Sequence, residues 1–153
     1  MKYSEYKIEK YLHPSFPIYS SRQSGREILV YNHYHSSVEM MKVLEGSIRL
    51  QIGTNYYECK KGDIVFILPS MLHGVTSLTE DATIEGIVFE TSLVNMPILQ
   101  FDFSEMFHRN QRIQYIINEQ DDIYEELCHN INKILFFVVS NYSYLIFSKS
   151  PPP

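Results

Sequence analysis

A succession of short apolar segments, separated by turn residues, occupies positions 28–90 and constrains the fold more than any other feature of the chain. Ile48, Leu50 and Ile52 alternate with polar residues, which is the period expected of a strand with one buried face. Residues 64–68 are apolar throughout, as in a strand buried on both faces, and Pro69 cannot continue a central ladder. The predicted strands are residues 28–31, 38–44, 48–52, 56–59, 64–68, 73–78 and 83–89. Strands of this length, with turns about every 8–12 residues, predict an antiparallel β-sandwich or barrel.

The segments on either side of this region differ from it. Residues 1–27 are polar and rich in tyrosine, and Pro14 and Pro17 interrupt any long element, which predicts an N-terminal arm or an irregular edge strand. Residues 91–147 contain no glycine and predict a helical extension with Asp121 or Asp122 at its N-cap. Residues 148–153 end in three prolines and predict a disordered tail.

The helical extension carries one apolar stripe. Its spacing places six residues on the same face of a helix: Ile123, Leu127, Ile131, Ile134, Leu135 and Val138. A stripe of this kind packs either on the outside of the barrel or against a second copy of the chain as a dimerisation helix. The sequence leaves both interpretations open.

Charge and composition exclude several classes of protein. The 153 residues suffice for one domain, and 13 Lys and Arg against 18 Asp and Glu give a net charge of −5, without the basic excess of a nucleic-acid-binding surface. The N-terminus lacks the apolar segment of a signal peptide, and residues 134–147 fall short of the roughly 20 that a membrane helix needs. Cys59 and Cys128 lie far apart, as in proteins of a reducing compartment. We therefore expect a soluble, cytoplasmic protein without a membrane partner.

Four residues form the constellation that carries chemistry. His33 and His35 are two residues apart and share one face of a strand, and Glu39 can return to that face after a short turn. His73 follows the strand that Pro69 ends. Three imidazoles and one carboxylate suit a divalent transition metal such as Zn, Fe, Mn, Ni or Cu, with positions left for water or substrate.

The spacing of these residues resembles the cupin motifs. His33-Tyr34-His35, then Glu39 and Gly46, reproduce the H-x-H-x3-E-x6-G segment of the first motif. Gly62 and His73 reproduce the glycine-to-histidine distance of the second motif, although Ser77 stands where that motif has asparagine. The resemblance implies an all-β cupin (jelly-roll) barrel over residues 28–90 with a short C-terminal α-helical extension.

Within the cupins, the chain resembles the N-terminal sensor domain of AraC-type transcriptional regulators. The matching segments are His33 through Gly46 and Lys60 through His73. The resemblance implies a small-molecule effector, such as a sugar or another polar metabolite, and helices that form a homodimer. DNA would be bound only through a C-terminal domain, and nothing after residue 120 resembles that domain. The chain is thus interpreted as the effector-binding and dimerisation part of such a regulator.

The arm adds candidate effector contacts. Arg22 and Arg26 can hold carboxylate or phosphate groups, and the rings of Tyr19 and Tyr31 suit sugars or aromatic ligands; solvated surface positions are the alternative for both arginines. The predicted ligand-binding residues are His33, His35, Glu39, His73, Tyr31, Arg22 and Arg26.

Three roles remain open for the His and Glu constellation: a metal site, a metal-free effector pocket, or barrel residues satisfied by one another and by water. We predict no catalytic residue. The alternative function is a stand-alone metal-dependent cupin enzyme, a dioxygenase, isomerase or decarboxylase.

Overall fold

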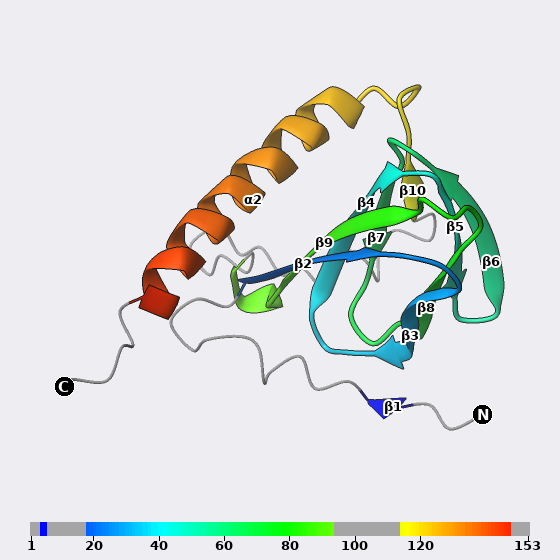
Figure 1. Cartoon of the computed structure of the whole chain (residues 1–153), viewed down its shortest axis with the longest axis horizontal. Coiled ribbons are helices and arrows are strands. Elements are labelled where there is room, and N and C mark those ends of the chain that lie inside the picture. The colour runs from blue at the N-terminus through cyan, green and yellow to red at the C-terminus, as the bar shows by residue number, and fades with distance from the viewer. Residues whose placement is uncertain (1–3, 6–17, 94–113, 148–153) are drawn as a thin grey trace.

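Two five-stranded sheets form a barrel in the computed structural model of the chain, which describes residues 4–5, 18–93 and 114–147 (Figure 1). The first sheet has the order β1-β3-β8-β5-β6 and the second the order β10-β7-β4-β9-β2. The strands are β1 (Ser4–Glu5), β2 (Ile18–Ser24), β3 (Ile28–Tyr34), β4 (Val38–Glu45), β5 (Ser47–Ile52), β6 (Asn55–Lys60), β7 (Ile64–Ile67), β8 (His73–Ser77), β9 (Thr83–Phe89) and β10 (Ile116–Ile117). Neighbouring strands pair antiparallel, apart from β1, which lies parallel to β3.

The barrel closes around an apolar core to which both sheets contribute. Ile48, Leu50 and Ile52 of β5 are buried on the inner face, and the residues between them are not, as the alternation predicts. Met41 and Val43 of β4 meet them from the second sheet. Burial of two apolar sheet faces against each other is the main favourable term in the folding of such a barrel.

The turn from β4 to β5 depends on Gly46. Its φ of 67° lies in the left-handed region, which favours glycine. A Cβ at this position would meet the side chains of Thr79 and Asp81 and would lie 3.0 Å from the Cα of Ala82. The glycine of the first cupin motif therefore serves both the conformation of the turn and the close approach of the 79–82 segment.

Helix α2 (Tyr124–Phe147) lies against the outer face of the second sheet (Figure 1). Ile131 is buried together with Met40, Ile64 and Ile87, and three stripe residues pack partly buried on the same cluster: Leu127, Ile134 and Leu135. Val138 is also buried. The described part of the stripe therefore packs on the barrel, except for Ile123, which is exposed.

The helix begins later than predicted. The carbonyl of Ile123 accepts the N–H of Leu127 at 3.0 Å, so Ile123 holds the N-cap position. Asp121 instead accepts the backbone N–H of Asn118 at 2.8 Å and closes the preceding turn. The prediction of Asp121 or Asp122 as the N-cap is therefore wrong. Glu125 and Glu126 lie in the first turn, where their negative charges interact favourably with the positive end of the helix dipole.

The predicted strands of residues 28–90 are confirmed with ends shifted by up to three residues. Within residues 1–27, for which an arm or an irregular edge strand is predicted, residues 18–24 form β2, an edge strand of the second sheet. The remainder of that arm (1–3 and 6–17), residues 94–113 of the extension and the tail 148–153 lie outside the described residues. Within the described residues, no helix is both long and apolar enough to span a membrane, and both cysteines are free thiols.

Candidate metal centre and ligand site

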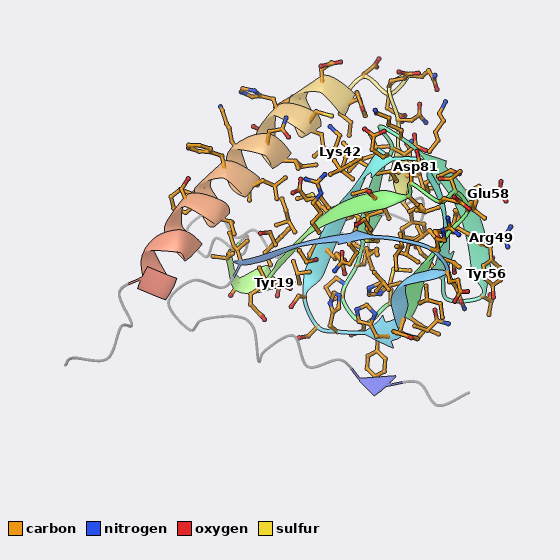
Figure 2. All side chains as sticks on the ribbon, in the orientation of Figure 1. Tyr19, Lys42, Arg49, Tyr56, Glu58 and Asp81 are labelled. Atoms are coloured by element: carbon orange, nitrogen blue, oxygen red, sulfur yellow. The ribbon has the colours of Figure 1, made fainter. Side chains whose placement is uncertain are left out.

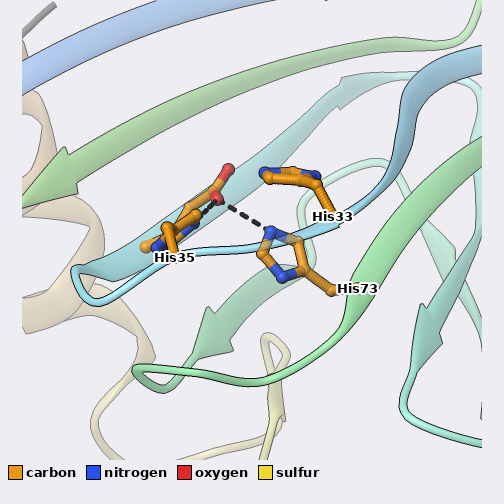
Figure 3. Close-up of side chains that lie close together, drawn as sticks. His33, His35 and His73 are labelled. Carbon is orange, nitrogen blue, oxygen red and sulfur yellow. Dashed lines mark hydrogen bonds and ion pairs between the residues drawn. The ribbon is translucent and has the colours of Figure 1, made fainter. Parts of the chain in front are cut away.

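The four residues of the predicted constellation meet inside the barrel. His33 comes from β3, His35 from the β3–β4 connection, Glu39 from β4 and His73 from the start of β8. One ligand atom from each lies within 4.8 Å of all the others, and all four residues are buried. Figure 3 shows the three imidazole rings converging on one place. The register explains this meeting, because His33 is paired directly with His73 across β3 and β8.

Backbone carbonyl groups fix the orientation of all three imidazoles. In each ring, Nδ1 lies at hydrogen-bond distance from the carbonyl oxygen of a residue two positions away. The pairs are His33 with Tyr31 (2.8 Å), His35 with Ser37 (3.0 Å) and His73 with Met71 (2.8 Å). A carbonyl oxygen can only accept a hydrogen bond, so Nδ1 carries the proton in each ring. In the neutral rings, Nε2 therefore presents a lone pair.

The carboxylate of Glu39 lies against two of these Nε2 atoms. Its Oε2 atom is 3.0 Å from Nε2 of His35 and 3.2 Å from Nε2 of His73 (Figure 3). Burial by itself would raise the pKa of Glu39, but the contacts with His35 and His73 outweigh it and lower the pKa from 4.5 to about 2. Glu39 is therefore ionised at neutral pH in spite of its burial.

With both rings neutral and protonated on Nδ1, this arrangement would place acceptor against acceptor. An ionised carboxylate cannot donate a hydrogen bond, and neither can the Nε2 of a neutral imidazole whose proton is on Nδ1. Each of the two contacts therefore needs a proton on Nε2, or both need a cation shared with the carboxylate. Burial makes an uncompensated carboxylate costly, so one of these two solutions must be present.

Protonation of more than one imidazole would place positive charges close to each other. The ring centroids lie 4.2 Å apart for His33 and His73, 5.0 Å for His35 and His73, and 5.4 Å for His33 and His35. Burial and the neighbouring His73 lower the pKa of His33, so this ring stays neutral where an isolated histidine would titrate.

The sequence matches one known family over most of the barrel. Residues 16–118 match the AraC-like ligand binding domain. The chain belongs to this family. The cupin-type barrel predicted from the sequence is thereby confirmed. The match establishes a ligand-binding domain and specifies neither a ligand nor a reaction.

Solved structures that are similar to this AraC-like domain have low sequence identity to it. KdgF from Halomonas sp. is 15% identical with a TM-score of 0.45, covering 51% of this chain and 71% of that one. An RmlC-like cupin from Shewanella frigidimarina is 20% identical with a TM-score of 0.41, covering 52% and 72%. Oxalate decarboxylase from Bacillus subtilis, a protein with Mn(II) centres, is 15% identical with a TM-score of 0.41, covering 67% and 34%. A comparison with curated proteins gives no match. These values carry no functional information.

Three of the predicted ligand contacts lie away from the cluster. Arg22 is exposed and is paired in the sheet with Glu85, on the face opposite to the barrel interior. Arg26 forms an exposed ion pair with Glu80 at 2.7 Å. The Tyr31 side chain is 75% exposed, and only its carbonyl reaches the site, through His33. The structure does not bring these three side chains to the cluster, and their role in binding stays a prediction.

Strand β2 contributes a different set of residues to the barrel interior. Val88 is paired with both Glu39 and Tyr19, so Tyr19 lies on the same inner face as the cluster. Ser21 and Gln23 follow on that face, and their side chains are hydrogen-bonded to each other at 3.1 Å. The sequence indicated Tyr19 but missed Ser21 and Gln23. Only the pairing of β2 with β9 reveals which side of this polar strand faces inward.

Proposed function

We propose that this AraC-like domain binds one divalent transition metal ion and that the ion takes part in holding a small polar effector. The observation that carries the proposal is the convergence of three imidazoles, each with Nδ1 at a backbone carbonyl, and one carboxylate in a buried site. A single divalent cation satisfies both acceptor-to-acceptor contacts of Glu39 at once. The ion would be held by Nε2 of His33, His35 and His73 and by an oxygen of Glu39.

The donor set limits the choice of metal. Imidazole nitrogen suits Zn, Fe, Ni and Cu, and a carboxylate oxygen also suits Mn, whereas the soft ions prefer thiolates. The cluster contains no thiolate, since Cys59 and Cys128 are not among its residues. The backbone carbonyls on the three Nδ1 atoms supply the outer hydrogen bonds that ligating histidines commonly have in metalloproteins. When bound, the metal supplies a Lewis-acidic centre with open positions for an oxygen ligand.

The charges around the cluster favour a neutral, hydroxyl-bearing effector. Glu39 is the charged group of the cluster, and the cations Arg22 and Lys42 occupy the outer face of the second sheet. Tyr19, Ser21 and Gln23 supply hydroxyl and amide groups on the inner face. A sugar or another polyol would use such groups, whereas a carboxylate would bind only through the metal.

We also propose that the domain regulates transcription as a homodimer, on the basis of the AraC-like family and of helix α2. DNA contacts belong to a separate domain, in keeping with the net charge of −5. A homodimer would use the side of α2 that faces away from the barrel, where Phe136 is 77% exposed and Phe137 54% exposed. Leu127 and Ile131 cannot serve as the seam, because they pack on the barrel.

A metal-dependent cupin enzyme is the second candidate. The same three-histidine, one-carboxylate set that would hold an effector could hold a substrate of a dioxygenase, isomerase or decarboxylase. Among the described residues, the cluster contains no second carboxylate that could serve as an acid or base. The match to a ligand-binding domain favours the sensor function of the two.

Two measurements on the purified, untagged protein test the proposal. Elemental analysis should find about one transition metal ion per chain, and a His33→Ala/His35→Ala variant should contain none. A thermal-shift screen with and without metal should then find stabilisation by neutral polyols, and by carboxylates only with metal. Absence of metal after incubation with Zn, Fe, Mn and Ni would refute the metal site. Oxygen uptake or turnover of a ligand by the loaded protein would favour the enzyme.

A further inference from the structure

The outer face of the first sheet carries a hydrogen-bonded pair directly behind the cluster. Nδ2 of Asn32 donates to Oε1 of Gln51 at 2.9 Å, and Nε2 of Gln51 donates to the carbonyl of Gly53 at 2.9 Å. Asn32 precedes His33 on β3, and Gln51 lies on β5, with β8 between the two strands. The Asn32–Gln51 pair therefore crosses one strand of the sheet.

The Asn32–Gln51 bond can pass over β8 because Gly74 has no side chain. Gly74 follows His73 on β8 and is paired with Gln51. A Cβ at Gly74 would collide with Oδ1 of Asn32 and would lie 3.1 Å from Cγ and 3.2 Å from Cα of the same residue. Any larger residue at position 74 would thus separate Asn32 from Gln51.

The backbone of β3 is irregular at the same place. Val30 is paired with Val75 and His33 with His73, so Tyr31 and Asn32 together lie opposite the single residue Gly74. Two residues opposite one constitute a β-bulge, which changes the direction of the side chains that follow it. A regular strand would advance the register by one residue, and a one-residue shift turns a side chain to the other face of the sheet.

The bulge determines where His33 points. It brings the carbonyl of Tyr31 to 2.8 Å from Nδ1 of His33, which fixes both the ring and its tautomer. Because the bulge interrupts the regular pairing between β3 and β8, the side-chain bond from Asn32 to Gln51 supplies a cross-sheet link at the point where that pairing is broken.

We propose that Asn32, Gly74 and Gln51 are positioning residues, which hold the bulge of β3 and so aim the His33 ring into the cluster. The consequence for metal affinity rests on the proposed function, whereas the orientation of His33 does not. The two can therefore be measured separately, one with metal and one without it.

The test compares Asn32→Ala and Gln51→Ala with the wild type and with Arg49→Ala. Arg49 lies on the outer face of β5, two residues from Gln51, and pairs with the exposed Glu58 at 3.2 Å, so it is a matched control (Figure 2). In the metal-free protein, long-range ¹H–¹⁵N spectra should show His33 protonated on Nδ1 in the wild type and in Arg49→Ala. Asn32→Ala and Gln51→Ala should each show a shifted His33 signal that averages the two tautomers.

With Zn²⁺ or Co²⁺, the dissociation constant of the metal should rise about tenfold or more in Asn32→Ala and in Gln51→Ala, as for other losses of outer hydrogen bonds at metal sites. It should stay within twofold in Arg49→Ala. The double variant should lose little more affinity than Gln51→Ala alone, because both single changes break the Asn32–Gln51 bond and Gln51→Ala also removes the bond to Gly53.

An unchanged His33 signal in Asn32→Ala and Gln51→Ala would overturn the inference, whether or not the wild type binds metal. If the wild type binds no metal, the proposed function fails and the spectra alone decide the inference. Should Asn32→Ala not fold, Asn32→Leu offers similar volume without the donor and should give the same spectral change.

Discussion

Two parts of the barrel interior, both reached by the inner face of β4, are held together by different forces. Met41 and Val43 of this strand join the apolar core, which is complete as it stands because its members need only one another. Glu39, two residues before Met41, joins three histidines in a cluster whose acceptors face each other. The polar part needs a proton or a cation to be complete, and the apolar part needs nothing further. Stability therefore resides mainly in one part and chemistry in the other.

Removing a core side chain should have the largest effect on stability and little on ligands. Leu50 is fully buried, so Leu50→Ala should lower the free energy of unfolding by about 2–5 kcal/mol, through lost burial and a remaining cavity. Chemical denaturation measures this change. The exposed Leu78 offers the control, since Leu78→Ala should change stability by no more than about 0.5 kcal/mol.

At temperatures where Leu50→Ala is still folded, its metal affinity should equal that of the wild type. Loss of metal affinity in the folded variant would contradict the division between the two parts of the interior.

Acid should lower the free energy of unfolding through the His and Glu cluster. The pKa of Glu39 is lowered on folding from 4.5 to about 2, so its contribution is present above pH 4.5 and is lost as the pH falls toward 2. That shift corresponds to about 3 kcal/mol. Burial and His73 also lower the pKa of His33 below 6.5, so a first loss of stability should begin as the pH falls through that value.

Denaturation of the metal-free protein across this range should show both losses, and Glu39→Gln should lack the second one. The exposed Glu58 supplies the comparison, with Glu58→Gln following the wild-type profile. If Glu39→Gln also kept the wild-type profile, the ionised state of the buried carboxylate would be wrong.

Metal should stabilise the polar part by an amount that mass action fixes. At a free metal concentration 100 times the dissociation constant, the gain should be about 2.7 kcal/mol. His73→Ala should lose this gain, because it removes one of the four ligands. His129, exposed on α2, serves as the control, and metal-dependent stabilisation that persists in His73→Ala but disappears in His129→Ala would place the site elsewhere.

The smallest effect is expected from the predicted arm. The ion pair of Arg26 with Glu80 is exposed on both sides, and such pairs contribute little. Arg26→Ala should therefore change stability by less than about 0.5 kcal/mol and leave effector affinity unaltered. A tenfold loss of effector affinity in Arg26→Ala would instead support the contact that the sequence predicted.

The sequence predicted most of the barrel because its strands carry local signals. The alternation of β5 and the apolar run of β7 depend on neighbouring residues alone, and both strands lie where predicted. Strand β2 lies in the segment for which an arm or an irregular edge strand is predicted. The sequence leaves that choice open because the inner face of the strand is polar, with Ser21 and Gln23 where an apolar residue would have shown the period. Its membership of the sheet depends on pairing with β9, which is a contact across some sixty residues of sequence.

The site, like the fold, could be predicted only where the signal is local in the sequence. The spacing of His33, His35, Glu39 and His73 predicted the cluster, although His35 lies in the connection after β3 and not on the strand face that the spacing predicts. The pattern does not contain the three carbonyl contacts at Nδ1, nor the bulge at Asn32, because both depend on the backbone path between strands. Those contacts set the protonation of the rings and hence what the cluster can bind.

We propose that a metal ion replaces the protons between Glu39 and the imidazoles. Titration of the metal-free protein with Co²⁺ or Zn²⁺ in weakly buffered solution, with a count of protons released, tests it most directly. We expect one ion per chain, with protons released on binding, and loss of both in Glu39→Gln. Absence of binding, or binding without proton release that survives in Glu39→Gln, would contradict it.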